Sequence, residues 1–180
     1  MSIYFTADTH FSQERTLNLS KRPFGNVTEM DLTLLVNWNK KIKPTDTVYH
    51  LGDFGLMNIR PLLNGKIILI KGNYERNLPY LLEGYENFFD EIYEYIHKIS
   101  YNYNDTIYNI TMAHEPSRVK NTPISENDIN IFGHVHKLCM IKPYGLCVST
   151  DAHHFEPITL DDVLFYHNLI LNFYNDDVFY

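Results

Sequence analysis

The sequence is poor in features that mark several other classes of protein. Only two cysteines occur among its 180 residues, Cys139 and Cys147, too few for the disulfide framework of a small secreted domain. They could face each other across a turn at residues 143–145, but we expect buried or half-buried thiols. The chain also lacks an apolar run of about 18 residues, and its first residues do not resemble a secretory signal. We therefore expect a soluble, cytoplasmic protein with no membrane partner.

Positive charge is also scarce. Fifteen Lys and Arg stand against 22 Asp and Glu, which gives a formal net charge of −7, and no stretch concentrates the cations. Proteins that grip long nucleic acids usually carry a basic patch, because contacts to phosphate dominate their affinity. The composition therefore disfavours long nucleic acid as a partner and leaves a short one open. The length fits a single domain over residues 1–180 with a layered core.

Apolar segments typical of strands alternate with helical patterns in the first half of the chain. We expect strands at residues 3–7, 46–51 and 66–71, the last a continuous apolar run typical of a buried parallel strand. Residues 29–41 show helical spacing, with Thr28 as the N-cap and Asp31 at N3 of a capping box. A short helix follows near residues 59–63, and residues 12–25 read as an irregular loop. This order predicts successive βαβ units of the α/β class.

Hairpins dominate the second half. Alternating residues 91–103 and 106–112 are joined by Asn104-Asp105, which is a hairpin signal. A strand at 129–132 precedes a second hairpin of residues 138–141 and 146–149. Thr159 and Asp162 then resemble a capping box that opens a C-terminal helix. Residues 168–174 fit either a helix or an edge strand, and their apolar character suggests a homodimer contact.

Five of the predicted strands end in side chains that bind metal ions. Asp53 follows Gly52 at the carboxyl end of its strand, the edge where open α/β sheets bind ligands. Asp8 and His10 lie two residues apart, so on an extended segment they would point to the same side, as would His134 and His136. Oxygen and imidazole ligands without thiolate suit Mn, Fe, Zn, Ni or Co. The full set predicts a site for two divalent metal ions with Asp53 as the bridge: Asp8, His10, Asp53, Asn73, His114, His134 and His136.

These motifs resemble, in order and rough spacing, those of the calcineurin-like metallophosphoesterases. The resemblance covers nearly the whole chain, and residues 21–24 and 46–54 are similar to the small bacterial and phage members. It implies a sandwich of two β-sheets flanked by helices, and a metal-bridging hydroxide that attacks phosphorus. It further implies two metal ions that share Asp53, and we expect these ions to be Mn²⁺. One is held with Asp8, His10 and His136, and the other with Asn73, His114 and His134.

One position departs from the family pattern. Tyr74 stands where the family usually has a histidine that contacts the phosphate or protonates the leaving group. A phenol, with a pKa of about 10, donates a hydrogen bond but moves protons poorly near neutral pH. We therefore expect slow turnover, a substrate with a good leaving group, or replacement by His153 or His154. Asp53, Asn73 and Tyr74 are the expected catalytic residues.

Two further residues are candidates for substrate binding. The guanidinium of Arg22 matches phosphate oxygens, although an ordinary surface arginine beside Pro23 fits this position equally well. His154 follows the last predicted hairpin and would lie near the metal site.

The sequence thus predicts a dinuclear metal-dependent phosphoesterase that acts on a small phosphodiester or phosphomonoester, with the diester favoured. Two alternatives remain. A metal-binding scaffold for protein–protein recognition would have lost turnover, as the tyrosine at position 74 allows. A nuclease is opposed by the acidic balance, and salt-dependent binding of oligonucleotides would revive it.

Overall fold

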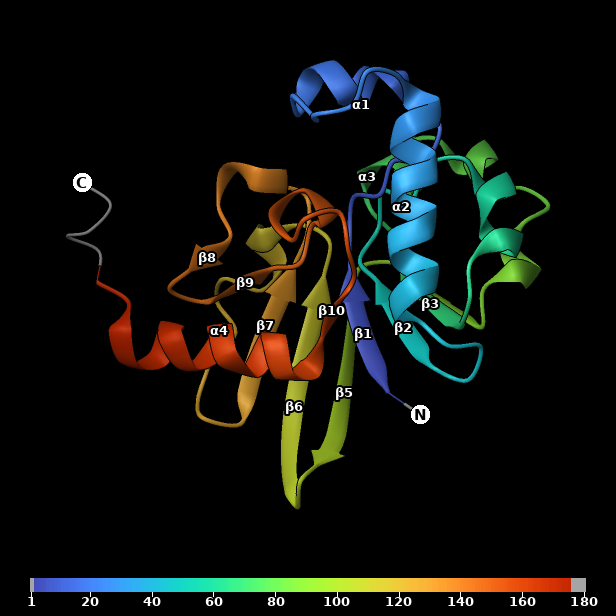
Figure 1. The fold of residues 1–180 in the computed structure, drawn as a ribbon. Coiled ribbons are helices and arrows are strands. Elements are labelled where there is room, and N and C mark those ends of the chain that lie inside the picture. The colour runs from blue at the N-terminus through green and yellow to red at the C-terminus, as the bar shows by residue number, and fades with distance from the viewer. Residues whose placement is uncertain (1, 176–180) are drawn as a thin grey trace.

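A computed structural model describes residues 2–175 as two five-stranded sheets with helices around them (Figure 1). The first sheet has the strand order β10-β1-β2-β3-β4, and the second has the order β5-β6-β7-β9-β8. Both sheets mix parallel and antiparallel neighbours. The fold is therefore the two-sheet sandwich with flanking helices that the family resemblance implies.

Parallel pairing joins most of the first sheet. Strands β1 (Ile3–Thr6), β2 (Thr47–His50), β3 (Lys66–Ile70) and β4 (Glu91–Tyr93) run parallel to one another, and β10 (Ile158–Thr159) pairs antiparallel with β1. Because parallel strands end at the same edge of a sheet, the segments that follow β1, β2 and β3 come together.

The second sheet begins with a long hairpin. Strand β5 (Ile96–Tyr103) pairs antiparallel with β6 (Thr106–Ala113), which is parallel to β7 (Asp128–Phe132). Strand β9 (Gly145–Cys147) is parallel to β7 and antiparallel to β8 (Ile141–Lys142). The segments after β6 and β7 therefore end at one edge as well.

Four α-helices accompany the sheets in the described part of the chain: α1 (Glu14–Leu19), α2 (Val27–Lys41), α3 (Asn73–Asn77) and α4 (Leu160–Phe173). Helix α2 packs Met30, Leu34 and Trp38 on the outer face of the first sheet. Helix α4 contacts β1, β9 and β10 and joins the core between the sheets. Among residues 2–175 no helix combines the length and the apolar character needed to cross a bilayer.

Successive side chains along the strands of the first sheet point to opposite faces, so its buried residues belong to two cores, as expected for a sheet covered on both faces. Phe5, Tyr49 and Ile68 of the first sheet face Ile110 and Ile131 of the second. Their neighbours along the same strands point the other way toward α2, and these are Val48, Ile67 and Leu69.

Several local predictions are confirmed. Asn104 and Asp105 form the hairpin turn with φ angles of 50° and 63°, the left-handed conformations that such turns require. The capping box at α4 is present, because the Thr159 side chain accepts from the Asp162 N–H and the Asp162 side chain accepts from the Thr159 N–H. Both cysteines are free, with Cys147 buried and Cys139 half-buried.

Other local predictions were wrong or imprecise. Residues 14–19 of the expected loop form the short helix α1. Asn26, not Thr28, caps α2, because its side chain accepts from the Glu29 N–H at 2.9 Å. The expected strand 91–103 is divided between β4 and β5, which belong to different sheets. Residues 136–138 form a 3₁₀ turn, so the second hairpin is shorter than expected.

The segment left open between helix and strand is helical through Phe173, and Ile170 packs into the core. The homodimer contact at this segment stays a prediction.

Candidate metal centre

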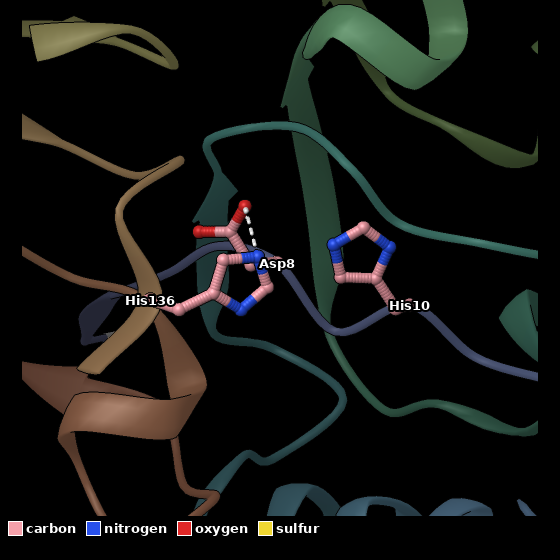
Figure 2. A group of neighbouring side chains, drawn as sticks. All are labelled: Asp8, His10 and His136. Atoms are coloured by element: carbon pink, nitrogen blue, oxygen red, sulfur yellow. Dashed lines mark ion pairs between the residues drawn. The ribbon is translucent and has the colours of Figure 1, made fainter. Parts of the chain in front are cut away.

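Asp and His side chains from both sheets gather into two adjacent groups at the edge where the parallel strands end. Asp8, His10 and His136 form one group, and Asp53, His114 and His134 form the other, with the ligand atoms of each group within 4.8 Å of one another. Figure 2 shows the first group, in which Asp8 and His10 leave the segment after β1 and His136 approaches from the segment after β7. Each group could hold one metal ion.

Three of the imidazoles are oriented by hydrogen bonds to their Nδ1 atoms. The Nδ1 atom of His10 lies 2.6 Å from Oε1 of Gln13, that of His114 lies 2.7 Å from the Leu51 carbonyl, and that of His136 lies 2.8 Å from Oδ2 of Asp151. Each partner is an acceptor, so Nδ1 carries the proton. The Nε2 lone pair is then free for a metal, which is the arrangement that metal-bound histidines usually show.

The Nε2 atoms point toward two buried carboxylates. His10 Nε2 lies 3.7 Å and His114 Nε2 lies 3.5 Å from Oδ2 of Asp53. His136 Nε2 lies 4.0 Å from Oδ1 of Asp8, the contact drawn as a dashed line in Figure 2. Burial lowers the pKa of both His10 and His114 to about 4. These two rings are therefore neutral at pH 7, the form that binds metals.

Asp8 provides the test of whether the residues fit a metal. Its Oδ2 atom accepts hydrogen bonds from the His134 N–H at 2.8 Å and from the Ser149 hydroxyl. Its Oδ1 atom is buried and has no hydrogen-bond partner in the described part of the chain. A buried carboxylate oxygen without a partner is costly unless an ion coordinates it. The donor set therefore fits a cation beside Asp8.

Asp53 lies between the two groups. Its Oδ1 atom accepts the Tyr74 N–H at 2.9 Å, which leaves Oδ2 facing one imidazole of each group. Burial raises the pKa of Asp53 to about 8, and the charges of Asp8 and Glu75 act in the same direction. Because divalent cations favour the ionised carboxylate strongly, bound ions would reverse this shift.

Asn73 belongs to the second group although it carries no charge. Its Oδ1 atom lies 3.0 Å from His114 Nε2 and 3.0 Å from His134 Nδ1. Those two nitrogens are themselves 3.2 Å apart. The Asn73 amide oxygen and the two imidazole nitrogens thus lie close to one another, so this oxygen could serve as a further ligand of an ion held by that group.

The local backbone differs from the extended conformation expected for Asp8-x-His10 and His134-x-His136. All four residues, and Asp53, have φ angles between 50° and 71°. Such left-handed conformations are strained for residues other than glycine and persist where the surrounding structure enforces them. The side chains therefore converge through sharp turns after the strands, and the alternation of an extended strand does not explain their placement.

Glycine allows the turns after β2 and β3 to touch. Gly52 has a φ of 84°, and a Cβ atom there would lie only 2.2 Å from the Gly72 nitrogen. The backbones of the two turns therefore approach each other closely at Gly52 and Gly72.

Glu75 is a structural residue that sequence analysis did not single out. Its carboxylate accepts the N–H groups of Asp53, Phe54 and Gly72 at 2.8–2.9 Å, and the side chain is buried. It therefore fixes both turns that carry Asp53 and Asn73. The signal available in the sequence was its position three residues after Gly72, where capping boxes place Glu.

Arg22 has a setting different from that expected of a substrate contact. Only 5% of it is exposed, and it donates to both oxygens of Asp151 at 3.0 and 2.7 Å. It also donates to the carbonyls of Thr9 at 2.8 Å and Asp8 at 2.5 Å. Asp151 also accepts a hydrogen bond from the His136 ring. Arg22 therefore holds in place the carboxylate that orients His136.

Of the other residues expected to contact the substrate, one lines the pocket and two do not. His154 is exposed and does not line the pocket over the two groups, as far as the described residues show. His153 is buried, with Nε2 2.8 Å from the Cys147 carbonyl. Tyr74 does line the pocket, and its ring meets His10 edge to face at 4.9 Å between centroids. Of the expected substitutes for the missing histidine, neither His153 nor His154 faces the site.

Comparisons with known proteins agree with this fold. No family model matches the chain. The uncharacterized protein MJ1445 of Methanocaldococcus jannaschii is 40% identical in an 82-residue alignment that covers 41% of this chain and 47% of that protein. The chain thus spans about half the length of that curated relative.

Two solved structures are similar. The protein of unknown function AQ665 from Aquifex aeolicus has a TM-score of 0.66 and 27% identity over 90% of this chain and 97% of that chain. A novel archaeal phosphodiesterase has a TM-score of 0.43 and 23% identity over 83% and 82% of the two chains. The match to AQ665 shows a fold shared over most of both chains. The two-sheet fold that the resemblance implies is present, with two Asp/His groups at one edge of the strands.

The pair Arg22–Asp151 gives a prediction about metal affinity. Replacing Asp151 by Ala leaves Nδ1 of His136 without its carboxylate and the buried Arg22 without its counter-ion. We expect the metal affinity to fall about 10–100-fold, as for other residues that orient a ligand. The free energy of unfolding of the metal-free protein should fall by about 3 kcal/mol, because a buried charge loses its partner. Calorimetric Mn²⁺ titration and urea unfolding measure the two effects.

The partly exposed pair Lys41–Glu156, with side chains 35% and 29% exposed, supplies the control. Glu156→Gln should change the free energy of unfolding by less than about 1 kcal/mol and leave Mn²⁺ affinity unaltered. Equal effects of the two substitutions would contradict the role assigned to Asp151.

Proposed function

We propose that the chain is a dinuclear metal-dependent phosphoesterase of the calcineurin-like superfamily, formed as one domain over residues 1–180. Its substrate is a small phosphodiester or phosphomonoester, with the diester favoured. One observation carries the proposal. Asp53 Oδ2 lies within 3.7 Å of an Nε2 atom from each of the two groups, while Oδ1 of the buried Asp8 has no hydrogen-bond partner among residues 2–175.

The ligands divide naturally between two ions. Asp8, His10 and His136 would hold one ion, Asn73, His114 and His134 would hold the other, and Asp53 would be shared between them. Mn²⁺ is our first choice, and Fe, Zn, Ni or Co also suit this donor set. When bound, such a pair of ions activates a water molecule and neutralises the charge of the phosphate. Because only two of the seven ligands are carboxylates, two divalent ions leave the centre positive, which favours an anionic substrate.

The protein's own residues position the substrate. Asn73 contributes a ligand without adding negative charge, so it does not repel a phosphate. Tyr74 faces the pocket and can donate a hydrogen bond to a phosphate oxygen or to the leaving group. Because no histidine stands at this position, protonation of the leaving group is weak, and esters that leave as stable anions should react best.

Hydrolysis of two chromogenic esters tests the proposal. We expect the protein, incubated with Mn²⁺, to hydrolyse bis-p-nitrophenyl phosphate faster than p-nitrophenyl phosphate. Asp53→Asn removes the shared ligand, so turnover should fall at least about 100-fold. Asp105→Asn, a change of the same kind in an exposed hairpin turn, serves as the control and should keep full activity. A protein shown by elemental analysis to hold two ions, yet inactive on both esters, would contradict the proposal and favour the scaffold alternative.

Substitution of Tyr74 gives a second prediction. Tyr74→His places an imidazole, which can transfer a proton at neutral pH, where the phenol now faces the pocket. We expect turnover of a diester with a poor leaving group, such as diphenyl phosphate, to rise by about 100-fold. Turnover of bis-p-nitrophenyl phosphate, whose leaving group needs little protonation, should change much less. Equal gains on both esters would show that Tyr74 does not limit proton transfer, and Tyr74→Phe would then report any hydrogen bond from its hydroxyl.

A further inference from the structure

The pocket over the metal centre is larger than a single phosphate requires. It encloses about 830 Å³, within the range of about 300–1,000 Å³ that pockets for drug-sized ligands show. Besides the ligand residues, its lining includes three cationic side chains, Arg15, Lys21 and Lys137. A ligand that fills the pocket can therefore reach the metal centre and these cations together.

The three cations are not neutralised by neighbouring carboxylates. Within residues 2–175, the Lys and Arg ion pairs involve Arg22, Lys41, Lys71, Arg76 and Arg118. Arg15, Lys21 and Lys137 are exposed and belong to none of these pairs. In a chain of net charge −7, three unpaired cations at one opening form a local positive field that attracts anions.

These cations come from two segments that face the same pocket. Arg15 lies on α1 and Lys21 follows that helix, whereas Lys137 lies in the 3₁₀ turn that also contains the metal-facing His136. The ammonium of Lys137 donates to the Lys21 carbonyl at 3.2 Å. This bond keeps the two segments together, so their charges act on one bound group.

Apolar side chains complete the lining. Leu19 and Leu138 are 65% and 86% exposed, and Leu78 lies in the same pocket. Large exposed apolar side chains around a concave site usually mark contacts with a ligand. The pocket thus offers a metal centre, a cationic group and an apolar surface to one molecule.

We propose that the natural substrate is a phosphoester that carries a second phosphate apart from the scissile one, together with a flat or apolar group. This proposal rests on the proposed function. Arg15 and the two lysines bind the second phosphate, since a guanidinium pairs with two of its oxygens and ammonium groups add charge. The leucines contact the flat or apolar group. Only one further phosphate is involved, because the chain has no basic run that could follow a polynucleotide.

A matched pair of substrates tests the proposal. Thymidine 5′-(p-nitrophenyl phosphate) has one phosphate, and its 3′-phosphorylated form has a second phosphate on the nucleoside. We expect kcat/KM at low ionic strength to be about tenfold higher for the 3′-phosphorylated ester, the size expected for a few exposed charge contacts. The advantage should shrink as salt is added, because exposed charges are screened.

Charge reversal assigns the effect to residues. In the double variant Arg15→Glu/Lys21→Glu we expect the ratio of the two kcat/KM values to fall to about one. Lys40→Glu supplies the control, because Lys40 is exposed on α2, outside the pocket lining and outside the ion pairs named above. This control should keep the tenfold ratio. We leave Lys137 unchanged, since it neighbours His136.

A binding measurement separates this proposal from the proposed function. Calorimetry on the metal-loaded protein should give a dissociation constant about tenfold lower for thymidine 3′,5′-bisphosphate than for thymidine 5′-phosphate, and the double variant should abolish the difference. Loss of turnover on every ester with this binding difference intact would refute only the hydrolytic function. Equal binding and equal kcat/KM within each pair, or ratios that the double variant leaves unaltered, would overturn the second-phosphate site.

Discussion

Two carboxylates buried close to each other are the constraint on which the site depends. Asp8 and Asp53 are both nearly inaccessible, and the carboxylate of Glu75 is buried beside Asp53. Burial and the charges of Asp8 and Glu75 disfavour the ionised form of Asp53 and raise its pKa to about 8. Burial acts in the same direction on Asp8, but the charges of His114, His136 and His10 outweigh it and hold the pKa of Asp8 below its usual value. The surrounding protein supplies backbone N–H groups, a hydroxyl and neutral imidazoles, but no Lys or Arg side chain bonded to either carboxylate in the described structure. Divalent cations would offset the charge of the buried carboxylates, and the Nε2 atoms of His10, His114 and His136 face the carboxylates where such ions would bind.

The rest of the fold holds these groups in position. Parallel strands of each sheet bring their ends to one edge, and the contact of Gly52 with Gly72 lets two turns pack backbone to backbone. Glu75 fixes those turns through three N–H groups. Gln13, the Leu51 carbonyl and Asp151 fix the rings of His10, His114 and His136. The strained left-handed turns persist because this shell of hydrogen bonds and the two packed sheets enforce them.

Most of the strands and helices, and the residues that cluster at the candidate metal centre, could be predicted from local sequence patterns. Strands at residues 3–6, 47–50 and 66–70 were predictable because buried parallel strands read as short apolar runs bounded by turn residues. The shell around the histidines was not predictable, because Asp151 and Arg22 are far apart in sequence and meet only through tertiary packing. Helix α1 was missed because six residues give too little periodicity. In the sequence, residues 91–103 look like one continuous strand. Only the pairing of β4 with β3 shows that residues 91–93 belong to the first sheet and not to the sheet of β5.

Spectroscopy of the bound metal tests the central claim most directly. Two Mn²⁺ ions should bind per chain and, if Asp53 is shared between them, should give the electron paramagnetic resonance spectrum of a spin-coupled pair. In Asp53→Asn the coupled spectrum should disappear. A wild-type protein that binds a single Mn²⁺, or two ions whose spectra show no coupling, would contradict a dinuclear centre bridged by Asp53.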